Sequence, residues 1–137
     1  MILRRELYFC PKPDTILDME IPEEAKTLLA KGDVYFATTD GLWPNITITA
    51  SGVVISEDEL LISDCAMTKA KENILKNPNC CIEAYDPKIE VGYKAFGKAT
   101  YHSEKEKVDI AKKRLEGEPF EPKGAVIIKI DKIFKVE

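Results

Sequence analysis

Between residues 34 and 63 the chain alternates short runs of β-forming residues with turn signals, and this pattern narrows the choice of fold more than any other feature. Four strands are expected there, over Val34–Thr39, Asn45–Ala50, Val53–Ile55 and Glu59–Ser63. Asp40-Gly41 is a strong tight-turn signal, and Ser51-Gly52 indicates a bulge or a close backbone approach. Because these strands follow one another without intervening helices, the pattern favours an antiparallel arrangement.

Three short helices and three further strands complete the expected fold. Pro22 starts an amphipathic helix that ends near Gly32, and Ser103-Glu104-Lys105-Glu106 fits the capping box of another helix. Gly97 in the middle of a strand indicates a second bulge. The remaining expected elements are a helix over Thr68–Lys76 and strands over Asn79–Tyr85, Tyr93–Tyr101 and Ala125–Val136.

These elements predict a mainly β fold with about three short helices. With six to seven antiparallel strands, a closed or half-closed barrel with Greek-key character is the economical way to hide the sheet edges. The chain has 137 residues, which fit one domain. We expect residues 1–20, which lack clear periodicity, to form a peripheral arm, and residues 21–137 to form the barrel domain.

Composition and charge restrict the partners. The net charge of −4 argues against nucleic acid, because a phosphate-binding surface needs a basic excess. No run of about 18 apolar residues is present, so no membrane span is expected. The N-terminus has charges where a signal peptide needs its apolar core, which predicts a cytoplasmic protein. The cysteines are expected to be free thiols without a metal, since the chain has one histidine and no C-x-x-C spacing; they are Cys10, Cys65, Cys80 and Cys81.

The segment from Ile62 to Pro78, ISDCAMTKAKENILKNP, indicates a phosphate site. A strand ends in a short loop, and the helix that follows carries Thr68, Lys69 and Lys71 in its first turn. Free backbone N–H groups at a helix N-terminus, a hydroxyl and two ammonium groups suit a phosphate. The alternative for this segment taken alone is a solvated helix with lysines on its outer face.

The order of these motifs resembles the FMN-binding split-barrel superfamily, which includes the pyridoxamine 5′-phosphate oxidases and small FMN-binding proteins. The resemblance covers the chain from about Ile21 to Val136. It rests on Ala37-Thr38-Thr39-Asp40-Gly41 with Pro44, on the Thr68–Pro78 helix, and on the Gly97 strand. Trp43, beside the turn, is either a lid on the core, which is favoured, or a contact to a flavin or a partner.

The resemblance implies a set of cofactor contacts. Four residues would face the isoalloxazine ring and ribityl chain: Thr47, Thr49, Ala50 and Ser51. The end of the preceding strand and the start of the helix would hold the phosphate, through Ser63, Asp64, Thr68, Lys69 and Lys71. Thr68 and Lys69 stand where the oxidases have serine and arginine in a helix start that reads S-R-K. Ala70 stands in place of its lysine, which Lys71 would replace one position along.

Departures from the oxidases argue against pyridoxamine phosphate oxidation. The oxidases carry an arginine for the cofactor phosphate where this chain has Thr47, and a lysine for the substrate phosphate where it has Gly52. Their C-terminal segment, rich in Trp, Gly, Tyr and Arg, is not visible before Glu137. No acid–base pair or nucleophile stands out, so no catalytic side chain is named.

The sequence therefore predicts a small flavoprotein that binds FMN noncovalently. Its role would be that of an oxidoreductase or electron-transfer protein, with redox chemistry supplied by the flavin. The family resemblance also implies a homodimer with the flavin at the subunit interface. Two alternatives stay open: a split-barrel binding module without flavin, and a relative that uses a deazaflavin or handles haem.

Overall fold

The structure, a computed structural model, describes residues 15–16, 20–50 and 52–136. Its strands are β1 (Thr15–Ile16), β2 (Val34–Thr39), β3 (Pro44–Thr49), β4 (Val53–Val54), β5 (Glu59–Asp64), β6 (Asn79–Asp86), β7 (Val91–His102) and β8 (Gly124–Val136). Its helices are α2 (Glu23–Lys31), α3 (Thr68–Lys76) and α4 (Lys105–Arg114). The expected arm falls largely outside the described residues, but its β1 pairs with β8.

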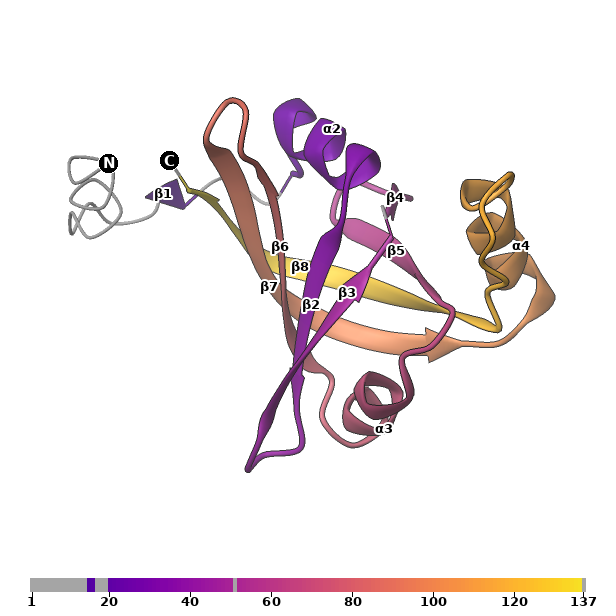
Figure 1. Cartoon of the computed structure of the whole chain (residues 1–137). Coiled ribbons are helices and arrows are strands. Elements are labelled where there is room, and N and C mark those ends of the chain that lie inside the picture. The colour runs from indigo at the N-terminus through magenta and orange to yellow at the C-terminus, as the bar shows by residue number, and fades with distance from the viewer. Residues whose placement is uncertain (1–14, 17–19, 51, 137) are drawn as a thin grey trace.

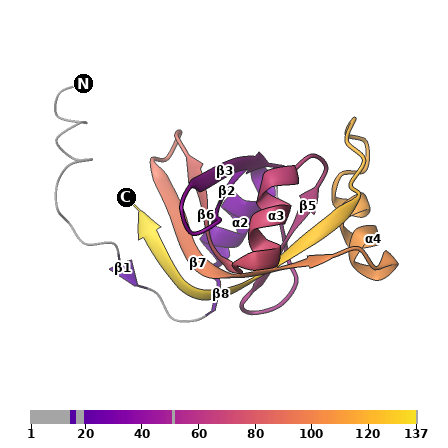
Figure 2. The ribbon, with the colours of Figure 1, turned by 90° about the horizontal axis from the view of Figure 1, so that it is seen from below.

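Eight strands form one antiparallel sheet, in which seven follow the order β3-β2-β6-β7-β8-β5-β4 and β1 pairs with β8 off this path. The long strands β7 and β8, of 12 and 13 residues, bend so that the sheet wraps around the core (Figure 2). Within the described part of the chain, no strand pairing joins β3 to β5 or β4, so the barrel is open along that side. The expectation of a mainly β, antiparallel split barrel with three helices is confirmed.

Two helices close the ends of the barrel. α2 covers one end and α3 the other, while α4 lies outside the sheet (Figures 1 and 2). The inner face of the sheet supplies large buried side chains such as Phe36 and Ile82, and α3 contributes the buried Ile74. Each such side chain stabilises the fold by about 1.5–3 kcal/mol. The buried Asn73 amide donates to Thr38 Oγ1 at 3.0 Å, which ties α3 to β2.

Two glycines mark close backbone approaches, as the sequence indicated. The β7–β8 register shifts between Phe96 and Gly97, and a Cβ on Gly97 would lie 2.3 Å from the Lys129 carbonyl oxygen. A Cβ on Gly52 would lie 2.7 Å from Leu60 Cδ1. Neither position can therefore carry a side chain without displacing its neighbour.

The β2–β3 hairpin extends away from the body of the barrel (Figure 1). Its turn is stabilised by Asp40 Oδ1, which accepts hydrogen bonds from the backbone N–H groups of Leu42 at 2.8 Å and Trp43 at 2.7 Å. Gly41 has a φ of +98°, a conformation that favours glycine. The favoured placement of Trp43 over the core is wrong, because 68% of this residue is exposed at the hairpin tip.

The predicted capping box at Ser103 is also wrong. α4 begins at Lys105, its N-cap is Glu104, and no side chain caps it. The Glu104 carboxylate is instead 2.7 Å from Nδ1 of His102, at the end of β7. The helix therefore starts one residue later than the capping box predicted.

Candidate functional site

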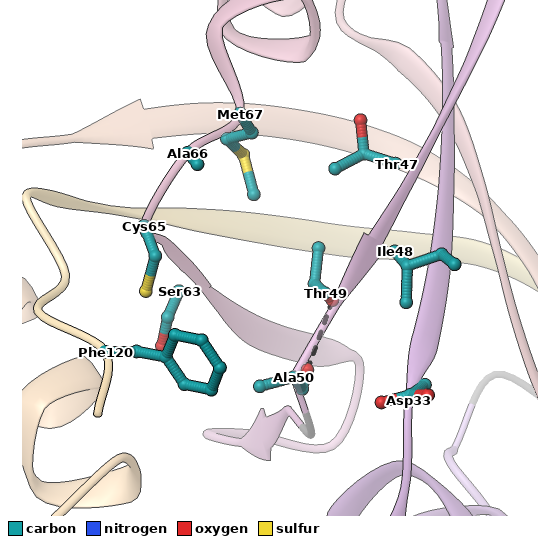
Figure 3. A pocket seen from close by; sticks show the side chains of 10 residues that line it. All are labelled: Asp33, Thr47, Ile48, Thr49, Ala50, Ser63, Cys65, Ala66, Met67 and Phe120. Carbon is teal, nitrogen blue, oxygen red and sulfur yellow. Dashed lines mark hydrogen bonds between the residues drawn. The ribbon is translucent and has the colours of Figure 1, made fainter. Parts of the chain in front are cut away.

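A pocket of about 320 Å³ opens between β3 and β5, on the side where the barrel is split (Figure 3). Its volume is at the lower end of the range typical of small-molecule sites. The wall combines segments far apart in the sequence: the start of β2, β3, the end of β5 with its following loop, and the loop before β8. The lining residues are Asp33, Thr47, Ile48, Thr49, Ala50, Ser63, Cys65, Ala66, Met67 and Phe120.

The β3 wall contains three of the four residues expected to face a flavin ring. Thr47, Thr49 and Ala50 all line the pocket, whereas Ser51 lies outside the described residues. The Thr49 hydroxyl is 3.1 Å from two backbone carbonyl oxygens and donates within the protein. The Thr47 hydroxyl accepts a hydrogen bond from Asn45 Nδ2 at 3.2 Å, so its own proton remains able to reach a ligand.

Ser63 supplies the most informative polar atom of the opposite wall. It is 6% exposed, and its buried hydroxyl has no hydrogen-bond partner among the described residues. A buried hydroxyl without a partner costs about 1–3 kcal/mol, and such groups are uncommon in folded proteins. Ser63 is one of the residues that line the pocket (Figure 3). A bound molecule would be able to supply the missing partner.

Asp64, the next residue, lies outside the pocket lining. It is fully buried, and both carboxylate oxygens are engaged: one accepts the backbone N–H of Met67 at 2.9 Å, the other the Tyr101 hydroxyl at 2.5 Å. Burial raises the pKa of Tyr101, and the bond to Asp64 raises it further. Because a carboxylate and a phosphate both only accept hydrogen bonds, the Asp64 carboxylate has no donor to offer a phosphate.

The structure places the other predicted phosphate residues on the first turn of α3, beside the pocket but not in its lining: Thr68, Lys69 and Lys71. Lys69 Nζ is 3.7 Å from a carboxylate oxygen of Asp40 and 3.7 Å from one of Glu72. Lys71 Nζ lies 4.3 Å from the centre of the Tyr101 ring. The structure therefore groups these residues, but each ammonium group already has a protein partner.

Sequence reasoning missed two informative wall residues, Cys65 and Phe120. Burial, with the nearby charges of Asp64 and Glu121, raises the pKa of the Cys65 thiol, so the thiol stays protonated at neutral pH. Phe120 is half-exposed although it lines the pocket. Its one sequence signal was its position in a proline-flanked loop, EPFEP, where neither helix nor strand periodicity explains an aromatic residue.

The pocket is mostly apolar, and no cation lines it. Asp33 is the one formally charged residue among the ten that form the wall. Glu121 lies close enough to Cys65 to affect the thiol's pKa. The chemistry available inside is therefore hydroxyl, thiol and aromatic contact rather than ion pairing with an anion.

The described residues were also compared with the requirements of a metal site and of a membrane-spanning helix. Across residues 15–16, 20–50 and 52–136, no group of three or more His, Cys, Asp or Glu side chains could hold a metal ion. No helix in that part of the chain is both long and apolar enough to cross a membrane.

Comparison with known proteins places the fold among characterised structures. No family model matches the chain. An uncharacterized protein of Methanocaldococcus jannaschii is 32% identical over 126 residues, which cover 87% of this chain and 83% of that protein.

Solved structures that share the fold include the following three. HupZ of Group A Streptococcus has a TM-score of 0.76 and 26% identity, covering 85% of this chain and 94% of that one. A candidate pyridoxamine 5′-phosphate oxidase from Lactobacillus delbrueckii has a TM-score of 0.71 and 25% identity, covering 87% and 98%. An FMN-binding protein from Syntrophomonas wolfei has a TM-score of 0.75 over 99% of this chain and 90% of its own; at 21% identity it supports the fold alone.

Proposed function

We propose that the chain is a small FMN-binding flavoprotein, because its structural neighbours are pyridoxamine 5′-phosphate oxidase-like, FMN-binding split-barrel proteins. The observation that carries the proposal is the pocket between β3 and β5, which contains the unpartnered Ser63 hydroxyl. The family's cofactor lies along the equivalent of β3, and this pocket opens there.

The pocket residues suit the neutral part of a flavin. Thr47 and Ser63 each offer a hydroxyl proton, which the carbonyl and ring-nitrogen acceptors of isoalloxazine or the ribityl oxygens would accept. Ile48 and Phe120 offer apolar and aromatic surface for a planar ring. The phosphate would extend toward the first turn of α3, where Lys69 and Lys71 lie.

When bound, a flavin supplies one- and two-electron redox chemistry, and the protein supplies binding, orientation and electrostatics. In this chain, Thr47 and Ser63 would orient the cofactor by donating hydrogen bonds from opposite walls. Phe120 and Ile48 would exclude water from its faces. The proposed role is that of an oxidoreductase or electron-transfer protein, and we assign no catalytic side chain.

Pyridoxamine phosphate oxidation is not part of the proposal. The oxidases' substrate lysine corresponds to Gly52, which is buried and whose Cβ would already meet Leu60. No lysine or arginine of the described residues lines the pocket to bind a second phosphate. A dianionic substrate would lose its hydration without gaining a counter-charge.

We further propose a homodimer, formed through the outer face of the sheet. On that face Tyr35 pairs with Ile48 across β2 and β3, and Cys81 pairs with Phe96 across β6 and β7. Ile46, on the same face of β3, is 70% exposed. Ala37 lies between Ile46 and Cys81, so an apolar row crosses four strands to Phe96, whereas Tyr35 lies opposite Glu83, which pairs with Lys94. An apolar row bordered by charged residues is typical of an interface. Since Ile48 also lines the pocket, a partner seated here would lie beside the cofactor.

The dimer is tested by light scattering on the wild type and on Ile46→Lys. We expect a dimeric wild type and a monomeric variant with weakened FMN binding, because a lysine at the centre of an apolar interface loses its hydration. Ile89→Lys is the matched control, since Ile89 is also exposed, at 56%, but lies in the β6–β7 turn. A monomeric wild type that retains FMN would contradict the shared site.

Cofactor binding is tested by absorbance of the purified protein and by titration with FMN. Bound FMN gives a yellow protein with an absorbance band at about 450 nm, and binding quenches or shifts flavin fluorescence. Failure to bind any flavin would favour a split-barrel binding module without flavin. Binding of a deazaflavin or of haem in place of FMN would identify the protein as a deazaflavin- or haem-binding relative.

A further inference from the structure

The first turn of α3 is surrounded by more negative than positive charge. Two ammonium groups, on Lys69 and Lys71, are accompanied by the carboxylates of Asp40, Asp64 and Glu72. The helix adds only about half a positive charge at its N-terminus. The carboxylates therefore already balance the positive charge of this site, and a dianionic phosphate placed there would find little net attraction.

Asp64 contributes most to this effect because it is the buried member of the group. Its carboxylate is fully buried, whereas Lys69 and Glu72 are exposed. Water and salt screen exposed charges strongly and buried ones much less. Asp64 also uses a donor that an anion would need, since it accepts the Met67 N–H at the start of α3.

Asp64 is held in place from a second side. Tyr101 donates its hydroxyl to the carboxylate at 2.5 Å, and Gly124 leaves the space that this hydroxyl occupies, since a Cβ on Gly124 would lie 2.1 Å from it. Lys123, the residue before β8, adds a hydrogen bond from its backbone N–H to the Asp64 carbonyl oxygen at 2.9 Å. The carboxylate is therefore a fixed part of the fold and cannot turn away when a ligand arrives.

From this arrangement we propose that Asp64 is a specificity-determining residue, which makes the site recognise a flavin by its neutral part and gives the phosphate little of the binding energy. The inference rests on the proposed flavin function and deepens it. The pocket walls agree with it, because their ligand-directed groups are the uncharged Thr47, Ser63 and Phe120. Riboflavin, which lacks the phosphate, should therefore bind about as well as FMN.

The experiment compares the dissociation constants of riboflavin and FMN for the full chain and for Asp64→Asn. Asparagine keeps an oxygen that accepts the Met67 N–H and has nearly the same shape, but removes the charge. For the wild type we expect the two constants to agree within about threefold. For Asp64→Asn we expect the preference for FMN over riboflavin to rise by about tenfold, since a buried unit charge near a dianion has an effect of this order.

Two variants separate charge from structure. Tyr101→Phe removes a hydrogen bond from Asp64 but leaves its charge, so it should affect both flavins equally and leave the ratio unchanged. Asp109→Asn removes a carboxylate from α4, outside the barrel, and should also leave the ratio unchanged. A merely structural role for Asp64 would move the two affinities together in every variant.

Three results would overturn the inference. A wild type that prefers FMN by about a hundredfold has a working phosphate site. An unchanged ratio in folded Asp64→Asn shows that its charge does not reach the phosphate. If that variant fails to fold, the FMN affinity of the wild type is measured between about 0.02 and 0.5 M salt. A tenfold weakening shows a cationic phosphate site and overturns the inference, whereas an unchanged affinity supports it. Failure of the wild type to bind either flavin refutes the proposed function itself, and this inference with it.

Discussion

The two sides of the C-terminal end of β5 differ in how their polar groups are satisfied. On the pocket side, the Ser63 hydroxyl is buried without a partner among the described residues. On the helix side, Asp64 is fully buried and both of its oxygens accept hydrogen bonds. Adjacent strand residues point to opposite faces. Two neighbouring residues of β5 therefore differ in whether their buried polar groups have hydrogen-bond partners.

This difference separates a position that serves binding from one that serves the fold. An unsatisfied buried hydroxyl lowers stability and persists where a ligand completes it. A buried carboxylate with two donors is costly to disturb, because its removal leaves those donors unpaired. Substitutions at the two positions should therefore act on different properties of the protein.

The largest expected effect is the loss of stability in Asp64→Ala. The variant leaves the Met67 N–H and the Tyr101 hydroxyl without their acceptor and removes the polar group at the start of α3. We expect the free energy of unfolding to fall by about 3 kcal/mol, as measured by urea denaturation. A loss below about 1 kcal/mol would mean that water or neighbouring groups replace the carboxylate easily.

Ser63→Ala should show the opposite behaviour. Because the hydroxyl has no partner among the described residues, its removal should leave stability unchanged or raise it by up to about 1 kcal/mol. Flavin affinity should fall by about tenfold, the loss of one ligand hydrogen bond. Ser103→Ala, an exposed serine outside the pocket, is the control for both measurements. Lower stability with unchanged flavin affinity would place the hydroxyl's role in the fold.

The hydrogen bond between Tyr101 and Asp64 should make the stability of the protein depend on alkaline pH. The pKa of Tyr101 is raised above its usual value of about 10, so the folded state holds this proton more tightly than the unfolded chain. The resulting stability is present below about pH 10 and is lost as the pH rises above it. The wild type should therefore lose stability more steeply than Tyr101→Phe as the pH rises from about 10 upward. Parallel denaturation curves for the two proteins would show that the phenol is not shifted.

The smallest effect is expected for Lys69→Ala. Its ammonium group is shared between Asp40 and Glu72 and lies outside the pocket lining. FMN affinity should fall by no more than about threefold, and riboflavin affinity should not change. A tenfold loss of affinity for FMN alone would show that Lys69 leaves its carboxylate partners to bind the phosphate, and it would contradict a small contribution of the phosphate to binding.

Local patterns in the sequence predicted the barrel well because each pattern acts over short range. Asp40-Gly41 gave the hairpin, and Gly97 gave the bulge that the β8 backbone requires. The capping box at Ser103 failed because the alternative contact, between His102 and Glu104, is equally local. Trp43 was expected to pack on the core, but the length of the hairpin carries it away from the barrel.

The candidate site was predicted less completely. The β3 residues were predicted from the family resemblance, which implies a cofactor along this strand, whereas Phe120 reaches the pocket from a loop that neither the resemblance nor any periodicity places. Asp64 was grouped with the phosphate residues because it ends the correct strand. Its actual partners, Met67 and Tyr101, depend on a loop conformation and on a strand 37 residues away in the sequence, neither of which a local pattern specifies.

The most direct test of the central claim is to map flavin binding onto the backbone by NMR, using the full isotopically labelled chain titrated with FMN. The account predicts that the largest amide shift changes fall on the two pocket walls, at Thr47 to Ala50 and at Ser63 to Met67, with a further change at Phe120. Shift changes confined to the outer face or to the β6–β7 turn would contradict it, and so would a spectrum that FMN leaves unchanged.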